Sequence, residues 1–219
     1  MSDAGYWIES RVLTDSECDD LITAVSTANR SRAGIRHLMS NTAVAALAAD
    51  DRMISIARRA LGISAIPFRA TLFEKSGEKN WLIGWHQDTA LPLASRFDQA
   101  GWGPWSEKHG VCYAHAPAWA LSRVVALRLH LDPSTPDNGP LRVIPGSHCA
   151  GLLSDDEVFA LARAHDQVEC PTPRGGVLAM RPLLVHSSSK AVSDEPRRVL
   201  HIEYADSLDL APGIRLAIA

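Results

Sequence analysis

The feature that most constrains the fold is a change of sequence pattern close to residue 64. Before Ile63, apolar residues recur at helical spacing in segments that begin at Thr14, Asn41 and Asp50. After it, short apolar runs divided by Pro and Gly predict strands over 65–75, 81–87, 122–132, 140–144, 176–180, 183–189 and 197–206. Helices first and many short strands afterwards predict a mainly β fold with flanking helices, arranged as a double-stranded β-helix, the jelly-roll or cupin-like barrel.

The sequence also predicts where several helices begin. Thr14-Asp-Ser-Glu17 and Ser154-Asp-Asp-Glu157 both have the form of a capping box, which predicts one helix from 14 to about Asn29 and another through Ala164. Two more helices are expected over 41–49 and 50–62, after a short strand over 6–8. The 219 residues with 46% hydrophobic content suffice for one core. We therefore expect a single domain over residues 1–219, with a helical N-terminal region over residues 1–64, a barrel over 65–206 and an aromatic loop over 89–120.

The strongest chemical signal is His86-Gln87-Asp88. Residues i and i+2 of an extended segment project to the same side, so His86 and Asp88 can reach one ion. The motif lies in apolar sequence, where a half-buried His and Asp need partners, and a metal supplies one to both. Taken alone, the pair is better explained as a solvated surface pair, and the apolar context is what favours the metal.

A third candidate ligand, His186, follows an apolar run over 183–185 that predicts a buried strand ending at this histidine. A turn and a returning strand would then place Arg197 or Arg198 near His186. Two imidazoles and one carboxylate leave half of a metal open, which suits Fe(II) that binds a bidentate oxo acid and dioxygen. The planar fork of an arginine matches the distal carboxylate of 2-oxoglutarate. The alternative is an arginine pair on the surface.

With the segments 138–141 and 145–148, Asn-Gly-Pro-Leu and Pro-Gly-Ser-His, these motifs resemble the phytanoyl-CoA dioxygenase family of Fe(II)/2-oxoglutarate oxygenases. The resemblance extends from roughly residue 65 to 205. It implies that His86, Asp88 and His186 are the iron ligands and catalytic centre, and that Arg197 and Ser188 hold the far carboxylate of the co-substrate. Arg198 fits that role less well.

The same resemblance implies a dioxygenase that uses Fe(II), 2-oxoglutarate and O2. Such an enzyme hydroxylates or otherwise oxidises a C–H bond of a small-molecule metabolite and releases succinate and CO2. Asp88 favours hydroxylation over halogenation, because related iron halogenases have a small residue at this position. Two alternatives stay open, a non-catalytic metal- or ligand-binding barrel and a metal-dependent hydrolase on the same barrel.

Two further residues are candidate co-substrate contacts. The family often has an aromatic residue on the strand before Asn138, where this chain has Arg128. Arg128 would either add a second cation near the co-substrate or point outward. Thr71 lies on a strand that the family also runs past the co-substrate.

The segment 89–120 carries three Trp and one Tyr among several Gly and Pro residues. A loop of this length without secondary structure is uncommon unless it has a function, such as a lid or a substrate wall. Candidate substrate contacts are Trp102, Trp105, Tyr113 and Trp119. The alternative is that these aromatic side chains pack on one another as a small core.

The net charge and the composition indicate which classes of binding partner to expect. The net charge is −3 and Lys and Arg are scattered along the sequence, so we expect no nucleic acid and no membrane partner, only a small-molecule substrate. No apolar run reaches membrane-spanning length and the first residues lack the pattern of a signal peptide, so a cytoplasmic protein is expected. The four cysteines show no CxxC spacing and are expected to be reduced.

Overall fold

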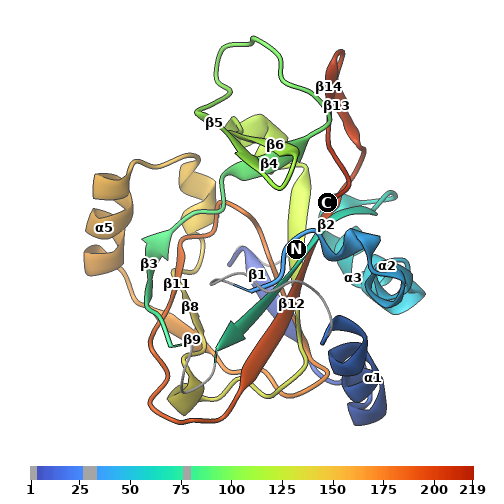
Figure 1. Ribbon diagram of the computed structural model, residues 1–219. Helices are drawn as coiled ribbons and strands as arrows, with labels where there is room; N and C mark the ends of the chain where they lie inside the picture. The colour runs from blue at the N-terminus through green and yellow to red at the C-terminus, as the bar shows by residue number, and fades with distance from the viewer. Residues whose placement is uncertain (1–3, 27–33, 76–79) are drawn as a thin grey trace.

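Two antiparallel sheets face each other at the centre of the molecule, in a computed structural model that describes residues 4–26, 34–75 and 80–219 (Figure 1). The five-stranded sheet has the order β1-β10-β7-β12-β2, and the four-stranded sheet has the order β3-β11-β8-β9. This is the expected jelly roll. Among the described residues no strand pairing joins the two sheets, so the barrel is open, with a cavity between the sheets.

The strands of the two central sheets are β1 (Tyr6–Glu9), β2 (Ile66–Lys75), β3 (Ile83–His86), β7 (Val124–His130), β8 (Leu141–Val143), β9 (Val168–Cys170), β10 (Val177–Met180), β11 (His186–Ser188) and β12 (Arg197–Ala205). The remaining strands are β4 (Ala90–Leu93), β5 (Trp105–Lys108), β6 (Val111–His115), β13 (Asp209–Ala211) and β14 (Ile214–Arg215). The helices are α1 (Asp15–Val25), α2 (Thr42–Ala48), α3 (Asp51–Leu61), α4 (Ala118–Leu121) and α5 (Asp155–Ala164). Among the described helices, none has the length and apolar character that crossing a membrane requires.

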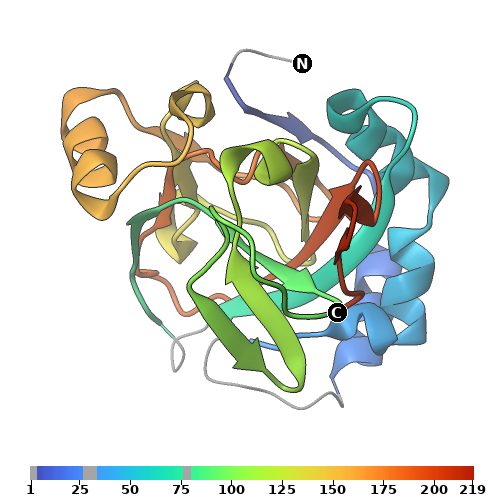
Figure 2. The same ribbon diagram turned by 90° about the horizontal axis from the view of Figure 1, so that it is seen from above.

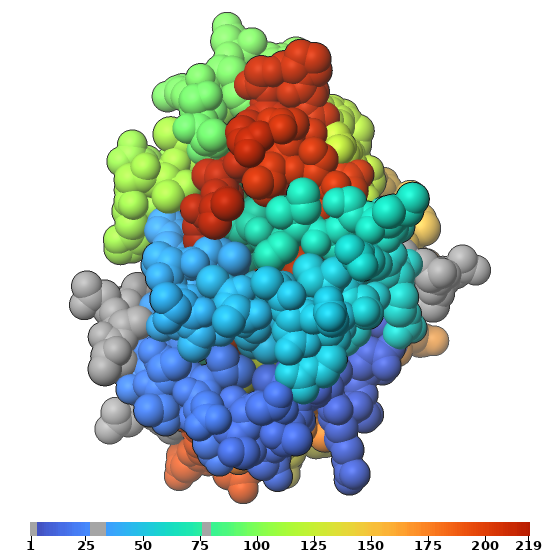
Figure 3. All heavy atoms as spheres, turned by 90° about the vertical axis from the view of Figure 1, so that its right-hand side faces the viewer, coloured from blue at the N-terminus to red at the C-terminus, as the bar shows by residue number. Residues whose placement is uncertain are grey.

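Helices α1, α2 and α3 cover the outer face of the five-stranded sheet, as Figure 1 shows on the right and Figure 3 shows face on. Alternation along β7 explains why. Leu127 and Leu129 join the core beneath the helices, while Arg128 points to the opposite face, between the sheets. The capping boxes expected at Thr14 and Ser154 are both present. Helix α1 ends at Val25, and the expected extension to about Asn29 falls in residues 27–33, outside the described residues.

The expectation of a loop without secondary structure over 89–120 is wrong. These residues contain a separate three-stranded antiparallel sheet, β4-β6-β5, and the short helix α4; Figure 2 shows this sheet from above. The hairpin between β5 and β6 turns at His109 and Gly110, whose φ angles of 51° and 78° are both positive. Two consecutive positive φ angles are typical of the type I′ turns that connect tight hairpins.

The expected strand over 183–185 and the expected hairpin with β12 are also wrong. Leu184 N–H donates to the carbonyl of Arg181 at 3.1 Å, so these residues form a buried turn, and β11 begins at His186. Strand β11 belongs to the four-stranded sheet and β12 to the five-stranded sheet. The prediction failed because a short apolar run indicates that residues are buried, but it does not indicate whether their backbone is extended.

Candidate active site

His86, Asp88 and His186 come together at one edge of the four-stranded sheet. One donor atom from each lies within 4.8 Å of the others, as required for a shared metal ion. His86 is the last residue of β3 and pairs in register with His186, the first residue of β11. Asp88 follows in the irregular segment after β3, and its backbone N–H donates to Pro182 O at 2.9 Å. The expected trio is therefore assembled by strand pairing and one backbone hydrogen bond.

Both imidazoles are held by their own strands. His86 Nδ1 lies 2.8 Å from Gly84 O, and His186 Nδ1 lies 2.8 Å from Leu184 O. A carbonyl only accepts hydrogen bonds, so Nδ1 carries the proton on each ring and Nε2 has a free lone pair. The Nε2 atoms lie 3.9 and 3.6 Å from the two carboxylate oxygens of Asp88. This tautomer leaves three donor atoms directed at one point, and carbonyls that orient histidine ligands in this way are usual around protein-bound metals.

Protonation of the trio favours metal binding. Burial lowers the pKa of His186 to about 3, so this imidazole is neutral at physiological pH. Burial opposes the charge of Asp88, but the imidazoles of His186 and His86 outweigh it and the pKa of Asp88 lies below its usual value. A neutral imidazole and a carboxylate are the forms that bind divalent metals.

A cavity of about 210 Å³ between the sheets contains the trio at one side and cations at another. Arg197, 3% exposed, starts β12, and its Nη2 lies 3.3 Å from Ser188 Oγ on the facing sheet. Its Nε and Nη1 are buried and have no hydrogen-bond partner among the described residues. Ser188 Oγ donates to Gly139 O at 2.9 Å. Two orphaned guanidinium N–H groups in a cavity form a site for an oxyanion.

Lys75, at the end of β2, is a third group at this point. Its Nζ donates to Ser188 Oγ at 2.8 Å and to Ser189 O at 2.5 Å. Burial and the nearby charges of Arg197 and Arg128 lower the pKa of Lys75 to about 7. Sequence reasoning missed this residue. Its signal was available, because positions 69, 71, 73 and 75 of an alternating strand share one face.

Arg128 points inward and lines the cavity. Of its two expected orientations, this is the one that adds a second cation near the co-substrate. Its Nη1 donates to His201 Nδ1 at 3.2 Å, and its Nε is buried with no partner in the part of the chain that the structure describes. His201 Nε2 then faces Glu203 at 3.6 Å, and Glu203 forms an ion pair with Arg69. Sequence reasoning did not find Arg69 or Glu203. A buried network of this kind holds both arginines in place along the cavity wall.

The remaining predicted residues lie elsewhere. Arg198 forms an ion pair with Asp132, with Nε 2.6 Å from Oδ2, away from the cavity, in keeping with the preference for Arg197. Thr71 is buried on the inward face of β2, but it does not line the cavity.

The four aromatic residues predicted to contact substrate do not line the cavity. Trp102 packs edge to face on Trp119, with ring centroids 6.1 Å apart, and Phe97 packs in the same way on Trp102 and Trp105. This is the small core given as the alternative. Tyr113 differs, because its hydroxyl lies 2.9 Å from His37 Nε2 and its ring lies near Arg69.

Comparison with known proteins gives a consistent result. The model of the family described as Phytanoyl-CoA dioxygenase (PhyH) matches residues 1–199. The chain is 26% identical over 178 residues to L-proline trans-4-hydroxylase of Streptomyces griseoviridis, covering 69% of this chain and 59% of that protein. It is 26% identical over 207 residues to ectoine dioxygenase of Sphingopyxis alaskensis, covering 84% of this chain and 61% of that protein. The chain thus spans about three fifths of the length of these two relatives.

Solved structures show the same fold. EctD from S. alaskensis with 2-oxoglutarate and 5-hydroxyectoine superposes with a TM-score of 0.70 at 22% identity, covering 94% of this chain and 75% of that one. The non-heme alpha ketoglutarate dependent carbocyclase SnoK from nogalamycin biosynthesis gives a TM-score of 0.70 at 16% identity, covering 94% and 81%. At these identities the likeness establishes the jelly-roll fold and not the reaction.

Proposed function

Since the chain belongs to the phytanoyl-CoA dioxygenase family, we propose that it is an Fe(II)- and 2-oxoglutarate-dependent dioxygenase acting on a small-molecule metabolite. The reaction would hydroxylate or otherwise oxidise one C–H bond and release succinate and CO2. One observation carries the proposal. A preorganised His86, Asp88 and His186 trio shares a cavity with Arg197, whose buried Nε and Nη1 have no partner.

The donor set fits iron. Two neutral imidazoles and one carboxylate would hold Fe(II) and leave room for the co-substrate and dioxygen, whereas the structural zinc sites of proteins use closed shells, often with thiolates. When bound, iron would activate dioxygen, the oxidant, which takes two electrons from 2-oxoglutarate and two from the substrate C–H bond. The protein contributes the orientation of the ligands, through the Gly84 and Leu184 carbonyls, and a cavity between the sheets for the reacting groups.

The far end of the cavity fits the second carboxylate of a dicarboxylic acid. Arg197 would form the charge-assisted pair, since its fork has two free N–H groups. Ser188 and Lys75 would bind the same carboxylate, because both already contact each other beside Arg197. We assign Arg128 to the co-substrate wall, where its charge lies close to that of Arg197.

The alternatives are less well supported. A metal-dependent hydrolase of the two-metal type would require a second group of carboxylates, and Asp88 is the one carboxylate among the described residues that line the cavity. A non-catalytic binding barrel would not require an unpaired arginine beside the metal site, since burying a cation without a partner costs stability.

Succinate formation tests the proposal. The protein, incubated with Fe(II), 2-oxoglutarate, ascorbate and oxygen, should release succinate slowly alone and faster with a suitable substrate. Asp88→Ala should lose both Fe(II) binding and succinate release, whereas Asp156→Ala, which removes an exposed carboxylate on α5, should retain both. Absence of succinate from the wild-type protein under all conditions would favour one of the alternatives.

A further inference from the structure

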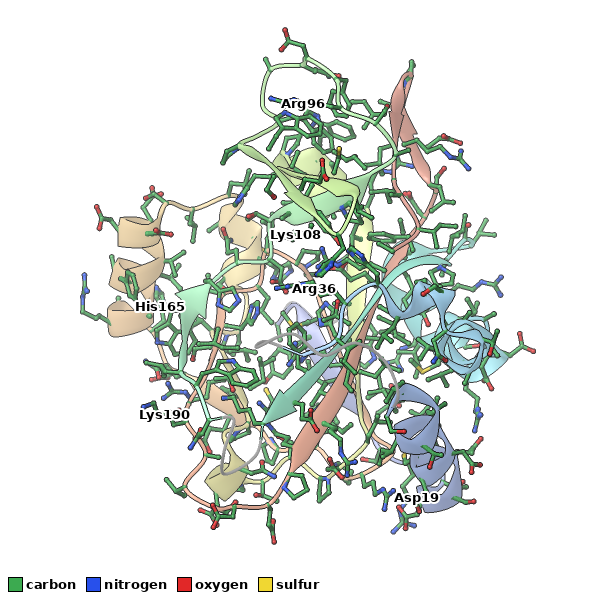
Figure 4. The ribbon with its side chains drawn as sticks, in the orientation of Figure 1. Asp19, Arg36, Arg96, Lys108, His165 and Lys190 are labelled. Atoms are coloured by element: carbon green, nitrogen blue, oxygen red, sulfur yellow. The ribbon has the colours of Figure 1, made fainter. Side chains whose placement is uncertain are left out.

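Basic side chains from separate segments of the chain gather around Tyr113, next to the cavity. Lys108 Nζ lies 4.8 Å from the centre of the Tyr113 ring, and the guanidinium carbon of Arg69 lies 5.9 Å from it. Arg36 acts electrostatically on Lys108 and on Tyr113, and Figure 4 shows Arg36 and Lys108 near each other at the middle of the view. We call Arg36, Lys108 and Tyr113 the basic rim. Scattered in sequence, these cations come together only in the fold.

Defined contacts hold Tyr113 and Lys108 of the rim in position. Tyr113 is 3% exposed, and its hydroxyl is held 2.9 Å from His37 Nε2, with the two rings nearly parallel at 11°. The type I′ turn at His109 and Gly110 sets the position of Lys108 at the end of β5. The tyrosine ring and the hairpin therefore fix one wall of the rim in place.

The cations of the rim lack an anion. Within the described residues, no carboxylate forms an ion pair with Arg36 or Lys108. Glu203, the buried carboxylate near Tyr113, is already bound by Arg69. Burial and the charges of Arg36 and Arg69 lower the pKa of Lys108 below its usual value. An oxyanion placed between Arg36 and Lys108 would relieve this repulsion.

Arg69 connects the rim to the reacting centre. It lines the cavity, and its charge acts on Asp88 on one side and on the Tyr113 phenol on the other. Exposure increases outward, from the mostly buried Arg69 through the half-buried Lys108 to the exposed Arg36. The rim thus lies on the solvent side of Arg69, where a molecule that enters the cavity from that side would meet it.

Charge balance shows which molecule is missing. Fe(II), Asp88 and one carboxylate of 2-oxoglutarate sum to zero, and the second carboxylate would lie among Arg197, Lys75 and Arg128 in the cavity. None of these anions pairs with Arg36 or Lys108, so the charges of the rim stay unbalanced. We propose, resting on the function proposed above, that the basic rim binds an oxyanion, a carboxylate or a phosphate, of the substrate that is oxidised. The substrate is then an anionic small molecule with its charged group held away from the metal.

Matched probes test this without knowledge of the substrate. Benzoate, phenyl phosphate and the neutral benzamide are titrated calorimetrically into protein loaded with Ni(II), with and without 2-oxoglutarate. At least one anion should bind roughly tenfold or more tightly than benzamide, because a hydrogen bond to a charged group is stronger than one to a neutral group. The stronger of the two anions identifies carboxylate or phosphate as the preferred group.

Variants locate the binding. Arg36→Met/Lys108→Met should abolish the preference for the anion, while Arg58→Met/Arg163→Met removes two exposed charges elsewhere and should keep it. Equal binding of the anions and benzamide by wild type, or an unchanged preference in Arg36→Met/Lys108→Met, would overturn the proposal. Failure of 2-oxoglutarate to bind would count against the proposed dioxygenase function, while the difference between wild type and Arg36→Met/Lys108→Met still reports on the rim.

Discussion

Replacing Lys75 by Met should stabilise the ligand-free protein and weaken co-substrate binding. Met has a similar length and no charge, so it fills the same space. The fall of the Lys75 pKa from its usual 10.5 to about 7 corresponds to roughly 5 kcal/mol of unfavourable charging in the folded state. The two hydrogen bonds of Nζ to Ser188 and Ser189 offset about 2 kcal/mol of that. The expected gain for Lys75→Met at neutral pH is therefore on the order of 3 kcal/mol.

The sign of the pH dependence follows from the same shift. The folded pKa of Lys75 lies below the unfolded one, so between pH 7 and 10.5 the unfolded chain binds more protons than the folded protein. Lys75 should therefore make wild-type stability rise with pH across this window. Lys75→Met should lose that contribution. Binding of 2-oxoglutarate should show the reverse trend in wild type, weakening above about pH 7 as the ammonium loses its proton.

Two measurements check these expectations. Urea unfolding of the ligand-free protein at pH 7 and 9 gives the stability, and calorimetric titration of Ni(II)-loaded protein gives the 2-oxoglutarate affinity, which should fall by about tenfold at pH 7 in the variant. Lys190→Met, at an exposed lysine labelled in Figure 4, is the matched control and should leave both unchanged. A Lys75→Met protein that is less stable than wild type at pH 7 and binds 2-oxoglutarate equally well would refute the reasoning.

Three other substitutions probe the site and its support. Arg197→Lys keeps the charge but loses the fork, so the KM for 2-oxoglutarate in the succinate assay should rise at least tenfold with a smaller change in kcat. Glu203→Gln leaves Arg69 buried without its anion and should lower the free energy of unfolding by about 3 kcal/mol, measured by urea titration; an unchanged midpoint would contradict this. Tyr204→Phe removes the 3.0 Å hydrogen bond to Ala48 O and should cost about 1 kcal/mol by the same method, with no effect on 2-oxoglutarate binding.

The metal trio was the portion of the site best predicted from sequence. His86 and Asp88 are two residues apart, which in extended chain brings both to one side; in the structure β3 ends at His86, and the N–H of Asp88 donates to Pro182 O. His186 had to be placed by its motif, and its expected position at the end of a strand was wrong, since it begins β11. The strand boundaries shifted, but the ligands did not, because the pairing of His86 with His186 depends on sheet register.

Residues that act through long-range contacts were not predictable in this way. Lys75 and Arg69 lie on β2 and line the cavity, and Glu203 lies on β12 and pairs with Arg69; these contacts exist only after the sheet forms. Arg36 and Lys108 of the basic rim also lie far apart along the sequence. Alternation along β2 predicts which residues share a face, but it does not predict what lies across the cavity from them.

The three-stranded sheet within 89–120 was missed for a different reason. Its strands are four or five residues long and Pro92 lies inside one of them, so the segment resembles a loop. The His109-Gly110 turn was the available signal, because few dipeptides adopt two positive φ angles.

The two histidine rings are oriented by backbone carbonyls two residues earlier in the chain, Gly84 and Leu184. Their orientation therefore does not depend on the identity of the side chains that line the cavity. Mutations that reshape the walls for a new substrate can accumulate without disturbing the metal geometry. In evolutionary terms, chemistry and selectivity are separately heritable in such a scaffold, which gives a physical reason why one ligand set can persist while the molecules it oxidises diverge.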